Sequence, residues 1–555
     1  MVVAERRLQL SIDRNSEMIT ICGFRFSTEK TVAVHFCRNR GVHSDPDLFL
    51  YGKRIPCREE ARFLGLTFDR RLTWVPHLRS VKTSCLQALN LLKVLSHTTW
   101  GADRGTLLYL HETLILSKLE YGSEVYSSAT SARLRMLDAV HHAGVRLATG
   151  AFRSSPIPSL LVDAGCLPLQ LRRRSNILRC WYRLKRTPNS LACRAMTGDC
   201  GLQTYNGRPG MPKPLGYRAG EMLGELADHP VPVLEHKVPK ICPWRLPEVA
   251  ICRSVPLGRE TANPQSQLVE FLDHLNVHGS SVQVYTDGSK GDSGAGFAVV
   301  FPDFNRSFSL PKWSSIFTAE LRAILYAITV LLTMPQRHFT IFSDSLSALQ
   351  ALGSWSSGNP LVIEILEWLY LCARRGRRVD FCWVPSHVGI PGNEKADALA
   401  KAAAVRPPTA RFALPAADTR QAIRQSALDM WQDAWANIGR NKLRTLKPDI
   451  KPYVYKDMSR KHGTVLARLR IGHSRMTHGF LMEGAPPPYC EDCIVPLTVH
   501  HVVAECPTYV EARDECLGRH RRTDGSYDLS SILGEEHNSR DIFDFLEEAG
   551  LLNRF

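Results

Sequence analysis

The chain has 555 residues, 44% of them hydrophobic, and its 70 Lys and Arg exceed its 54 Asp and Glu to give a net charge of +16. This length suggests three or four domains with enough apolar content for their cores, and the basic balance favours nucleic acid as a partner, although not specifically. Met1 to Leu10 contains no apolar stretch of signal-peptide length, and no run in the chain reaches membrane-spanning length, so we expect a soluble intracellular protein with no membrane partner, in the nucleus or the cytoplasm.

Residues 1–190 are predicted to start with β-like stretches at 18–26, 31–36 and 62–68 and to become helical from about Thr83. A later segment combines basic and aromatic side chains, as a nucleic-acid groove does, but a solvated helix face explains it at least as well. Its members are Arg172, Arg173, Arg174, Arg179, Trp181, Tyr182, Arg183, Lys185 and Arg186.

Four short strings in this part occur in a meaningful order: GFRFSTEKT at 23–31, FLGLTFD at 63–69, YG at 121–122 and AGCLPL at 164–169. They resemble the palm end and thumb of reverse transcriptases from non-long-terminal-repeat retrotransposons. That family has paired aspartates upstream of the first string, whereas this sequence contains no Asp-Asp dipeptide. The resemblance therefore implies a truncated remnant without polymerase activity and without the family's endonuclease module, or a subunit that needs a separate palm.

Residues 191–277 are predicted to form an extended connector, because prolines are frequent and periodic apolar residues are few. The prolines are Pro230, Pro232, Pro239, Pro243, Pro247 and Pro256.

Residues 278–404 alternate between strand and helix periodicity. The strands are expected at 282–287, 295–301, 306–310, 338–343 and 378–384, and the helices at 318–334, 345–352, 361–372 and 393–404. This order places Asp287 at a strand end, Glu320 in a first helical turn, Asp344 directly after a strand and Asp397 on the last helix. All four are expected to meet at one end of the sheet.

Four carboxylates at one site need cations, because two of them ~4 Å apart repel by roughly 4 kcal/mol at an effective dielectric near 20. Hard oxygen ligands select Mg²⁺ or Mn²⁺, and two such ions stabilise the attacking and leaving oxygens of a displacement at phosphorus. His387, on a loop flanked by Gly and Pro, is placed to shuttle a proton.

Each of these residues also has a structural interpretation. Asp344 before a helix suits an N-cap, Asp287 before Gly suits a turn, and His387 alone suits an ordinary loop. Glu320 and Asp397 are compatible with solvated helix positions. The combination is more specific than any single member.

The motifs TDGS at 286–289, TAEL at 318–321, SDS at 343–345, WVPSH at 383–387 and GNEKAD at 392–397 follow one another in order. They resemble the type 1 ribonuclease H family over residues 278–404. The resemblance implies a mixed five-stranded sheet flanked by helices and cleavage of the RNA strand of RNA/DNA hybrids. It also implies two Mg²⁺ or Mn²⁺ ions held by Asp287, Glu320, Asp344 and Asp397, with His387 handling protons.

Residues 405–483 are predicted to be a linker and a helical region, with Arg406-Pro407-Pro408 and Pro415 marking the linker. The helix is indicated by residues spaced four apart, which favour a core stripe over a base-stacking platform. They are Ile423, Ala427, Trp431 and Trp435.

The chain's 16 cysteines are mostly single and are expected to be reduced thiols. The one Cys-x-x-Cys, Cys490 and Cys493, precedes His501 and Cys506, a spacing that suits tetrahedral Zn²⁺. His500 is an adjacent competitor, and unligated thiols are the alternative. The pattern resembles the zinc-binding tail of the same retrotransposons, and we expect a zinc module at 484–520 followed by a tail at 521–555.

The sequence thus predicts a multidomain α/β protein that hydrolyses the RNA strand of RNA/DNA hybrids as part of a retrotransposon-derived polyprotein. The competing hypothesis is an inactive remnant that binds nucleic acid through its basic thumb and its zinc tail. Partners are expected to be the hybrid, other nucleic acid and other proteins encoded by the element.

Overall fold

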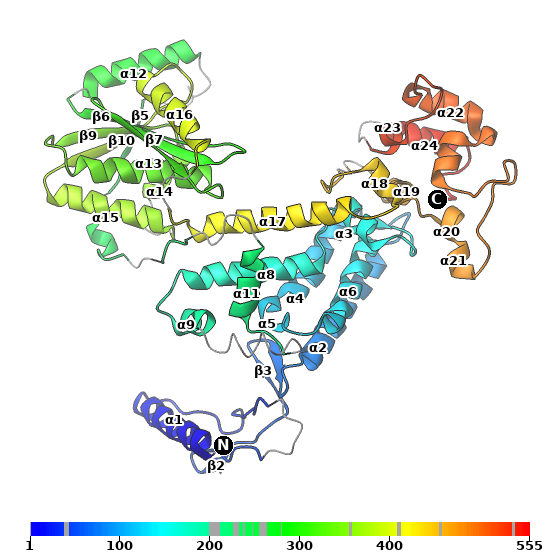
Figure 1. Ribbon diagram of the computed structural model, residues 1–555, viewed down its shortest axis with the longest axis horizontal. Coiled ribbons are helices and arrows are strands. Elements are labelled where there is room, and N and C mark those ends of the chain that lie inside the picture. The colour runs from blue at the N-terminus through cyan, green and yellow to red at the C-terminus, as the bar shows by residue number, and fades with distance from the viewer. Residues whose placement is uncertain are drawn as a thin grey trace. The chain divides into compact units, whose positions relative to one another are not determined.

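The structure is a computed structural model (Figure 1) that describes the chain except for residues 1, 38–43, 199–210, 226–231, 237–238, 247, 255–262, 279, 354–357, 408–411, 454, 456–457 and 535–538. The chain forms two compact units that are both discontinuous in sequence. The first unit comprises residues 1–176, 205–215 and 427–555, and the second comprises 177–204 and 216–426.

The second unit is built on a mixed six-stranded sheet with the order β5-β10-β9-β6-β7-β8. Strands β5, β10, β9 and β6 run parallel to their neighbours, and β6, β7 and β8 form an antiparallel meander. The strands are β5 Ile251–Arg253, β6 Val282–Lys290, β7 Ala295–Val300, β8 Asn305–Leu310, β9 His338–Ser343 and β10 Arg378–Trp383.

Helices cover both faces of this sheet, as Figure 1 shows. One face packs on α13, α14 and α15 through the largest apolar core of the described residues, and the other packs on α12 and α16 around Phe271, Tyr285 and Phe342. Alternation along the strands explains the two cores, since Val284 faces the first and Tyr285 the second. The helices of this unit are α9 Leu191–Thr197, α11 Leu215–Gly224, η2 Pro243–Arg245, α12 Pro264–His278, α13 Ile316–Leu331, α14 Leu346–Leu352, α15 Pro360–Arg374 and α16 Pro391–Ala404.

The expected mixed sheet with flanking helices is confirmed, but the sheet has six strands rather than five. The additional strand is β5, which comes from the segment predicted to be an extended connector and pairs in parallel with β10. That segment also contains the fifteen-residue helix α12, so its description as an extended connector is wrong over these residues. Pro230, Pro247 and Pro256 of that prediction, and Pro408 of the following linker, lie outside the described residues.

The first unit combines the two ends of the chain. Its N-terminal elements are α1 Val2–Ile21, β1 Phe49–Leu50, β2 Lys53–Arg54, β3 Glu60–Phe63, β4 Leu66–Asp69, α2 Val75–Leu95, α3 Arg104–His111, η1 Glu112–Leu116, α4 Ser117–Glu120, α5 Ser123–Tyr126, α6 Ser131–Thr149 and α7 Ile157–Asp163. Its C-terminal elements are α18 Lys442–Leu446, α19 Arg460–Ile471, α20 Arg475–His478, α21 Phe480–Glu483, η3 His501–Glu505, η4 Pro507–Tyr509, α22 Val510–Leu517, η5 Gly518–His520, α23 Leu529–Gly534 and α24 Ser539–Glu548.

Two of the short strings from the N-terminal part contact each other. Leu64 and Gly65 form the two-residue turn between β3 and β4, with φ of 44° and 81°, the left-handed pair that such hairpins require. The Tyr121 hydroxyl donates to the Leu64 carbonyl at 2.9 Å, and a Cβ on Gly122 would lie 2.6 Å from Leu66. The glycines are therefore needed for this close packing. By contrast, residues 18–21, predicted to begin a strand, end helix α1, and α2 starts at Val75 rather than near Thr83.

Arginines of the C-terminal segment bind backbone carbonyls of the N-terminal segment. The Arg460 guanidinium donates to Leu147 O at 2.7 Å and to Ala148 O at 2.6 Å, at the end of α6, where helical carbonyls lack intrahelical partners. The Arg468 Nε donates to Gly150 O at 3.0 Å. These bonds explain why residues 1–176 and 427–555 share a unit, whereas the sequence suggested boundaries at 190 and 405.

Two long helices, α8 Leu169–Lys185 and α17 Ala416–Ala436, contribute residues to both units. The stripe predicted on α17 is buried, since Trp431 and Trp435 are 7% and 0% exposed, and the Trp435 Nε1 donates to Lys447 O at 2.9 Å. On α8, Tyr182 is buried against Leu178, while Arg173 pairs with Asp138 at 3.0 Å. Part of the basic and aromatic segment therefore stabilises the fold. Within the described residues, no helix is both long and apolar enough to cross a membrane.

Candidate active site and C-terminal metal centre

The parallel pairing of β6 and β9 brings two aspartates together. Thr286 is in register with Ser343, so the next residues, Asp287 and Asp344, are neighbours at the carboxyl edge of the two strands, where open α/β sheets place their ligands. Asp287 does not end its strand, because β6 continues to Lys290 and Asp287 pairs with Ala298 on β7. Asp344, the first residue after β9, therefore lies beside Asp287 in the interior of β6.

Helix α13 supplies the third carboxylate. Its N-cap, Ser315, accepts from the Thr318 amide at 3.2 Å and also donates to Asp418 at 2.8 Å. Glu320 is the fifth helical residue, two positions further along the helix than the sequence suggested. It reaches the strand because Gly288 has no side chain, and a Cβ there would lie 2.6 Å from the Glu320 amide.

Asp287, Glu320 and Asp344 form what we call the carboxylate cluster, in which one oxygen of each lies within 4.8 Å of the others. Asp287 and Glu320 are only 4% and 5% exposed, and their Oδ2 and Oε2 atoms are buried without a hydrogen-bond partner among the described residues. Buried, unpaired carboxylate oxygens are costly unless a cation satisfies them.

The pKa values of the three acids also show that their negative charges are poorly compensated. Burial, with repulsion from Asp344 and Asp397, raises the pKa of Asp287 to about 8. Burial and the charge of Asp287 raise the pKa of Glu320 well above its ordinary value, and burial also raises that of Asp344. The oxygen donors and the accumulated negative charge fit divalent cations such as Mg²⁺ or Mn²⁺.

The fourth predicted acid, Asp397, lies beside this cluster and belongs to a second group with His387 and Glu394. Its Oδ2 forms an ion pair with Lys401 Nζ at 2.7 Å and is 4.0 Å from His387 Nδ1. The His387 side chain is 66% exposed and its φ is 57°, a backbone conformation that non-glycine residues rarely adopt and that is often found at functional sites.

Asn393 was missed as a candidate, although it stands in the motif at 392–397. Its Nδ2 donates to Asp344 Oδ2 at 3.4 Å, and it is 2% exposed. Trp383, at the end of β10, donates from Nε1 to the Asp344 carbonyl at 2.9 Å. Both residues orient the loop that carries Asp344. Their signal in the sequence was proximity to the acidic motifs, not their residue type.

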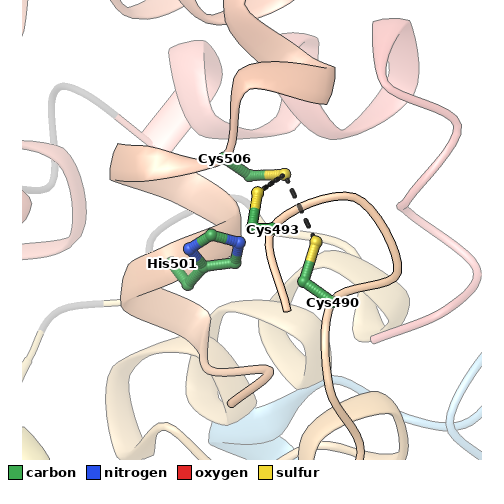
Figure 2. A group of neighbouring side chains, drawn as sticks. All are labelled: Cys490, Cys493, His501 and Cys506. Atoms are coloured by element: carbon green, nitrogen blue, oxygen red, sulfur yellow. Dashed lines mark hydrogen bonds between the residues drawn. The ribbon is translucent and has the colours of Figure 1, made fainter. Parts of the chain in front are cut away.

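The first unit contains a different cluster, shown in Figure 2 and called here the C-terminal Cys/His cluster: Cys490, Cys493, His501 and Cys506. The two cysteines of the Cys-x-x-Cys lie on a loop, His501 opens the π-helical turn η3, and Cys506 follows that turn directly. The Cys506 Sγ is 3.8 Å from Cys490 Sγ and 3.9 Å from Cys493 Sγ. Zn–S bonds of about 2.3 Å in a tetrahedron require S···S separations of about 3.8 Å.

The ligand assignment within this cluster favours His501 over His500. His501 is 5% exposed, and its Nε2 is buried without a hydrogen-bond partner among the described residues. Its Nδ1 contacts Glu505 at 3.3 Å, the kind of carboxylate partner that orients metal-bound imidazoles. The His500 side chain also pairs with Glu505, but it is 57% exposed and is not a member of the cluster. The neighbouring His501 imidazole lowers the pKa of the Cys490 thiol to about 7, which favours the thiolate that zinc binds.

Comparison with known proteins gives two groups of similar sequences. A family model described as RNase H matches residues 279–405. The ribonuclease H of Paracidovorax citrulli is 34% identical over 143 residues, which cover 22% of this chain and 92% of the relative.

Two retrotransposon proteins are also similar. The Retrovirus-related Pol polyprotein from type-1 retrotransposable element R1 4 of Nasonia vitripennis is 23% identical over 150 residues, 27% of this chain and 38% of the relative. The RNA-directed DNA polymerase from mobile element jockey of Drosophila melanogaster is 23% identical over 150 residues, 27% of this chain and 16% of the relative. The chain thus spans well under half the length of both polyproteins.

Proposed function

The chain belongs to the ribonuclease H family through residues 279–405, and from this premise we propose that it hydrolyses the RNA strand of RNA/DNA hybrids by a two-metal mechanism. The observation that carries the proposal is the carboxylate cluster, in which Asp287, Glu320 and Asp344 converge within 4.8 Å. Two of these acids have buried oxygens without hydrogen-bond partners among the described residues.

Each residue has a role in this proposal. Asp287, Glu320 and Asp344 hold divalent cations, and Asp397 on α16 completes the ligand set from the neighbouring group. Bound Mg²⁺ or Mn²⁺ supplies the positive charge that stabilises the attacking and leaving oxygens at phosphorus. Asn393 and Trp383 fix the loop of Asp344, so the carboxylate is oriented before substrate arrives.

His387 handles the proton of the leaving 3′ oxygen. The Nδ1 of its exposed side chain is 4.0 Å from Asp397 Oδ2, and its position on a loop allows contact with a substrate backbone. Gly389, with φ of 84°, and the bond from its amide to Glu394 at 3.2 Å shape this loop. Proton transfer by a positioned imidazole contributes about 10²–10⁴-fold to the rate of such reactions.

The proposed substrate is recognised by its backbone. RNA differs from DNA by the 2′ hydroxyl, and hybrid geometry is read through sugar and phosphate contacts rather than base edges. Cleavage is therefore expected to be independent of sequence, and the net charge of +16 supports phosphate binding that weakens with salt.

The test is a cleavage assay on a hybrid with labelled RNA, using the full chain in Mg²⁺. Loss of one metal-binding carboxylate should remove several kcal/mol of transition-state stabilisation, so Asp287→Asn should cleave roughly 10²–10³-fold more slowly. Asp292→Asn is the matched control, because Asp292 is an exposed acid on the hairpin after β6 and should cleave like the wild type.

Double-stranded RNA and double-stranded DNA of the same sequence complete the assay and should remain uncut. Hybrid binding without Mg²⁺-dependent cleavage by the wild type would contradict the enzyme and support the binding protein. Equal rates for Asp287→Asn and Asp292→Asn would show that cleavage arises elsewhere.

Two further roles belong to the same proposal. The C-terminal Cys/His cluster holds one zinc ion, supported by its tetrahedral S···S separations. Residues 1–190 are related to a reverse transcriptase palm end and thumb, a role in keeping with the similarity of the chain to retrotransposon proteins.

A further inference from the structure

A fourth set of metal-binding atoms lies in the second unit and shares no residue with the carboxylate cluster. It consists of Cys252 on β5, His274 on α12 and Cys382 on β10, and one ligand atom of each lies within 4.8 Å of the others. We call it the edge Cys/His cluster. Two of its three members come from the segment that precedes the ribonuclease H match.

Sheet pairing and helix packing bring these residues together. Cys252 and Cys382 are opposite each other in the parallel pair β5 and β10, so their side chains leave the sheet on the same face. Helix α12 covers that face, since Phe271 packs with Cys382 and Phe342 in one apolar core. His274 follows Phe271 by three residues and is therefore on the same side of the helix.

The distances suit a metal ion. The His274 Nε2 is 3.8 Å from Cys252 Sγ and 3.6 Å from Cys382 Sγ. Bonds of about 2.3 Å to sulfur and 2.0–2.1 Å to nitrogen in a tetrahedron require N···S separations of about 3.5–3.6 Å. The two observed N···S separations are close to these values.

In this arrangement one imidazole nitrogen, His274 Nε2, faces two cysteine sulfurs. A neutral imidazole nitrogen carries either one proton or one lone pair, so Nε2 serves a single sulfur at a time, yet both sulfurs approach it. The Cys252 Sγ also has a partner in the Phe381 carbonyl at 3.1 Å. A shared cation gives all three atoms one common partner.

We propose that the edge Cys/His cluster binds one Zn²⁺ through Cys252, His274 and Cys382, with its fourth position open to water. Thiolate and imidazole ligands select zinc over magnesium, so this site does not compete for the ions of the carboxylate cluster. Cys252 is exposed and Cys382 is buried, which gives the ion a route from solvent to a protected position.

A zinc ion bound there would crosslink strand β5 and helix α12 to strand β10. Strand β5 has only three residues, and such a short edge strand is weakly held. Its continuation bonds to β10 through the Ser254 amide and the Trp383 carbonyl at 3.0 Å. Trp383 in turn supports the Asp344 loop. Zinc would therefore hold β5 and α12 against the strand that borders the active site.

The test measures zinc in the full chain, purified under reducing conditions with zinc supplied, in a Cys490→Ser/Cys493→Ser background that removes the C-terminal centre. The background protein should retain about one zinc per chain, and Cys252→Ser or His274→Gln should each lose it. Cys252→Ser is the safer variant because its side chain is exposed. The matched control is Cys242→Ser, another exposed cysteine, which should keep the zinc.

Hydrogen exchange supplies a second readout. Residues 251–253 and 264–276 should exchange faster in Cys252→Ser than in Cys242→Ser, and adding zinc should slow exchange only in the latter. A background protein without zinc, or equal zinc in Cys252→Ser and Cys242→Ser, would overturn the proposal. Neither readout depends on hybrid cleavage, so failure here leaves the proposed ribonuclease unaffected.

Discussion

The carboxylate cluster and the C-terminal Cys/His cluster gather metal-binding atoms in different ways. The carboxylates come from a strand interior, a strand end and a helix, and they accumulate charge that raises the pKa of Asp287 to about 8. The Cys/His ligands come from one loop and the turn after it. A large sheet positions the first cluster, whereas Cys490 and Cys493 of the second lie on a loop outside regular secondary structure. Metal should therefore be needed for activity in one and for folding in the other.

Removal of the zinc ligands tests the folding half of this comparison and should give the largest effect. In Cys490→Ser/Cys493→Ser the chain should lose about one zinc, and with it a binding free energy of about 10–16 kcal/mol that structural sites contribute to folding. Residues 489–520 should then exchange amide hydrogens rapidly. Hybrid cleavage should persist, because the carboxylate cluster lies in the other unit.

The control for this double variant is Cys516→Ser, which changes a half-buried cysteine of the same segment that is outside the cluster. It should retain zinc and slow exchange. Unchanged zinc in the double variant would contradict the C-terminal centre and would remove one side of the comparison.

Removal of a carboxylate tests the other half. Asp344→Asn should slow hybrid cleavage by roughly 10²–10³-fold, because a lost ligand removes several kcal/mol of transition-state stabilisation. Its urea midpoint should be equal to or higher than that of the wild type without Mg²⁺, since burial and charge repulsion oppose the ionised form of Asp344. Loss of folding instead of activity would show that both clusters are structural.

The convergence of the acids was predictable from the sequence because it follows from strand pairing. Asp287 and Asp344 each stand one residue beyond positions that are in register, and alternating apolar residues identify both strands. The close approach of Glu320 to the strand depends on the absence of a side chain at Gly288. The motif TDGS contains this glycine, but the sequence alone does not show that it allows this contact.

Other features have no local signal. The bonds of Arg460 to carbonyls of α6 join residues more than three hundred positions apart, so the shared unit of the two chain ends could not be expected. Helix α12 was missed although Leu268, Phe271 and Leu275 have helical spacing, because the prolines around it suggested an extended segment. The pairing of Cys252 with Cys382 was invisible for the same reason.

Acidification should affect the stability of the two units in different ways. Burial lowers the pKa of His111 to about 4 and that of His141 to about 2, both below the ordinary value of 6.5. Below pH 6.5 the unfolded chain binds protons that the folded first unit excludes. The stabilisation present above pH 6.5 is therefore lost as the pH falls, by on the order of 1.4 kcal/mol per pH unit for each histidine.

In the second unit, Asp287 gives the opposite pH dependence of stability. Its raised pKa means that the folded state holds a proton that the unfolded chain has already released, so acidification favours the folded state at this residue. Urea midpoints of the two units at pH 7.5 and 5.0 check this contrast. Replacement of one buried imidazole, as in His111→Gln, should flatten the pH dependence of the first unit. The exposed His97, changed to Gln, is the control and should leave it unchanged. Equal slopes in the two variants would contradict the assignment to the buried pair.

Replacement of Asn393 should give the smallest of these effects, because Asn393 positions the metal ligand Asp344 and does not bind metal itself. Its Nδ2 contacts Asp344 Oδ2 at 3.4 Å from a 2% exposed side chain, and loss of such an outer partner costs about 10–100-fold in metal affinity or activity. Asn393→Ala should therefore need about tenfold more Mg²⁺ for half-maximal hybrid cleavage, and saturating Mg²⁺ should restore most of the rate. Asn305→Ala, on the far edge strand β8, is the control with wild-type Mg²⁺ dependence. A rate defect that Mg²⁺ does not relieve would assign Asn393 to the fold or to substrate contact. In either case the carboxylate cluster would be tuned differently from the C-terminal cluster, where Glu505 supports His501 from within the same turn, η3.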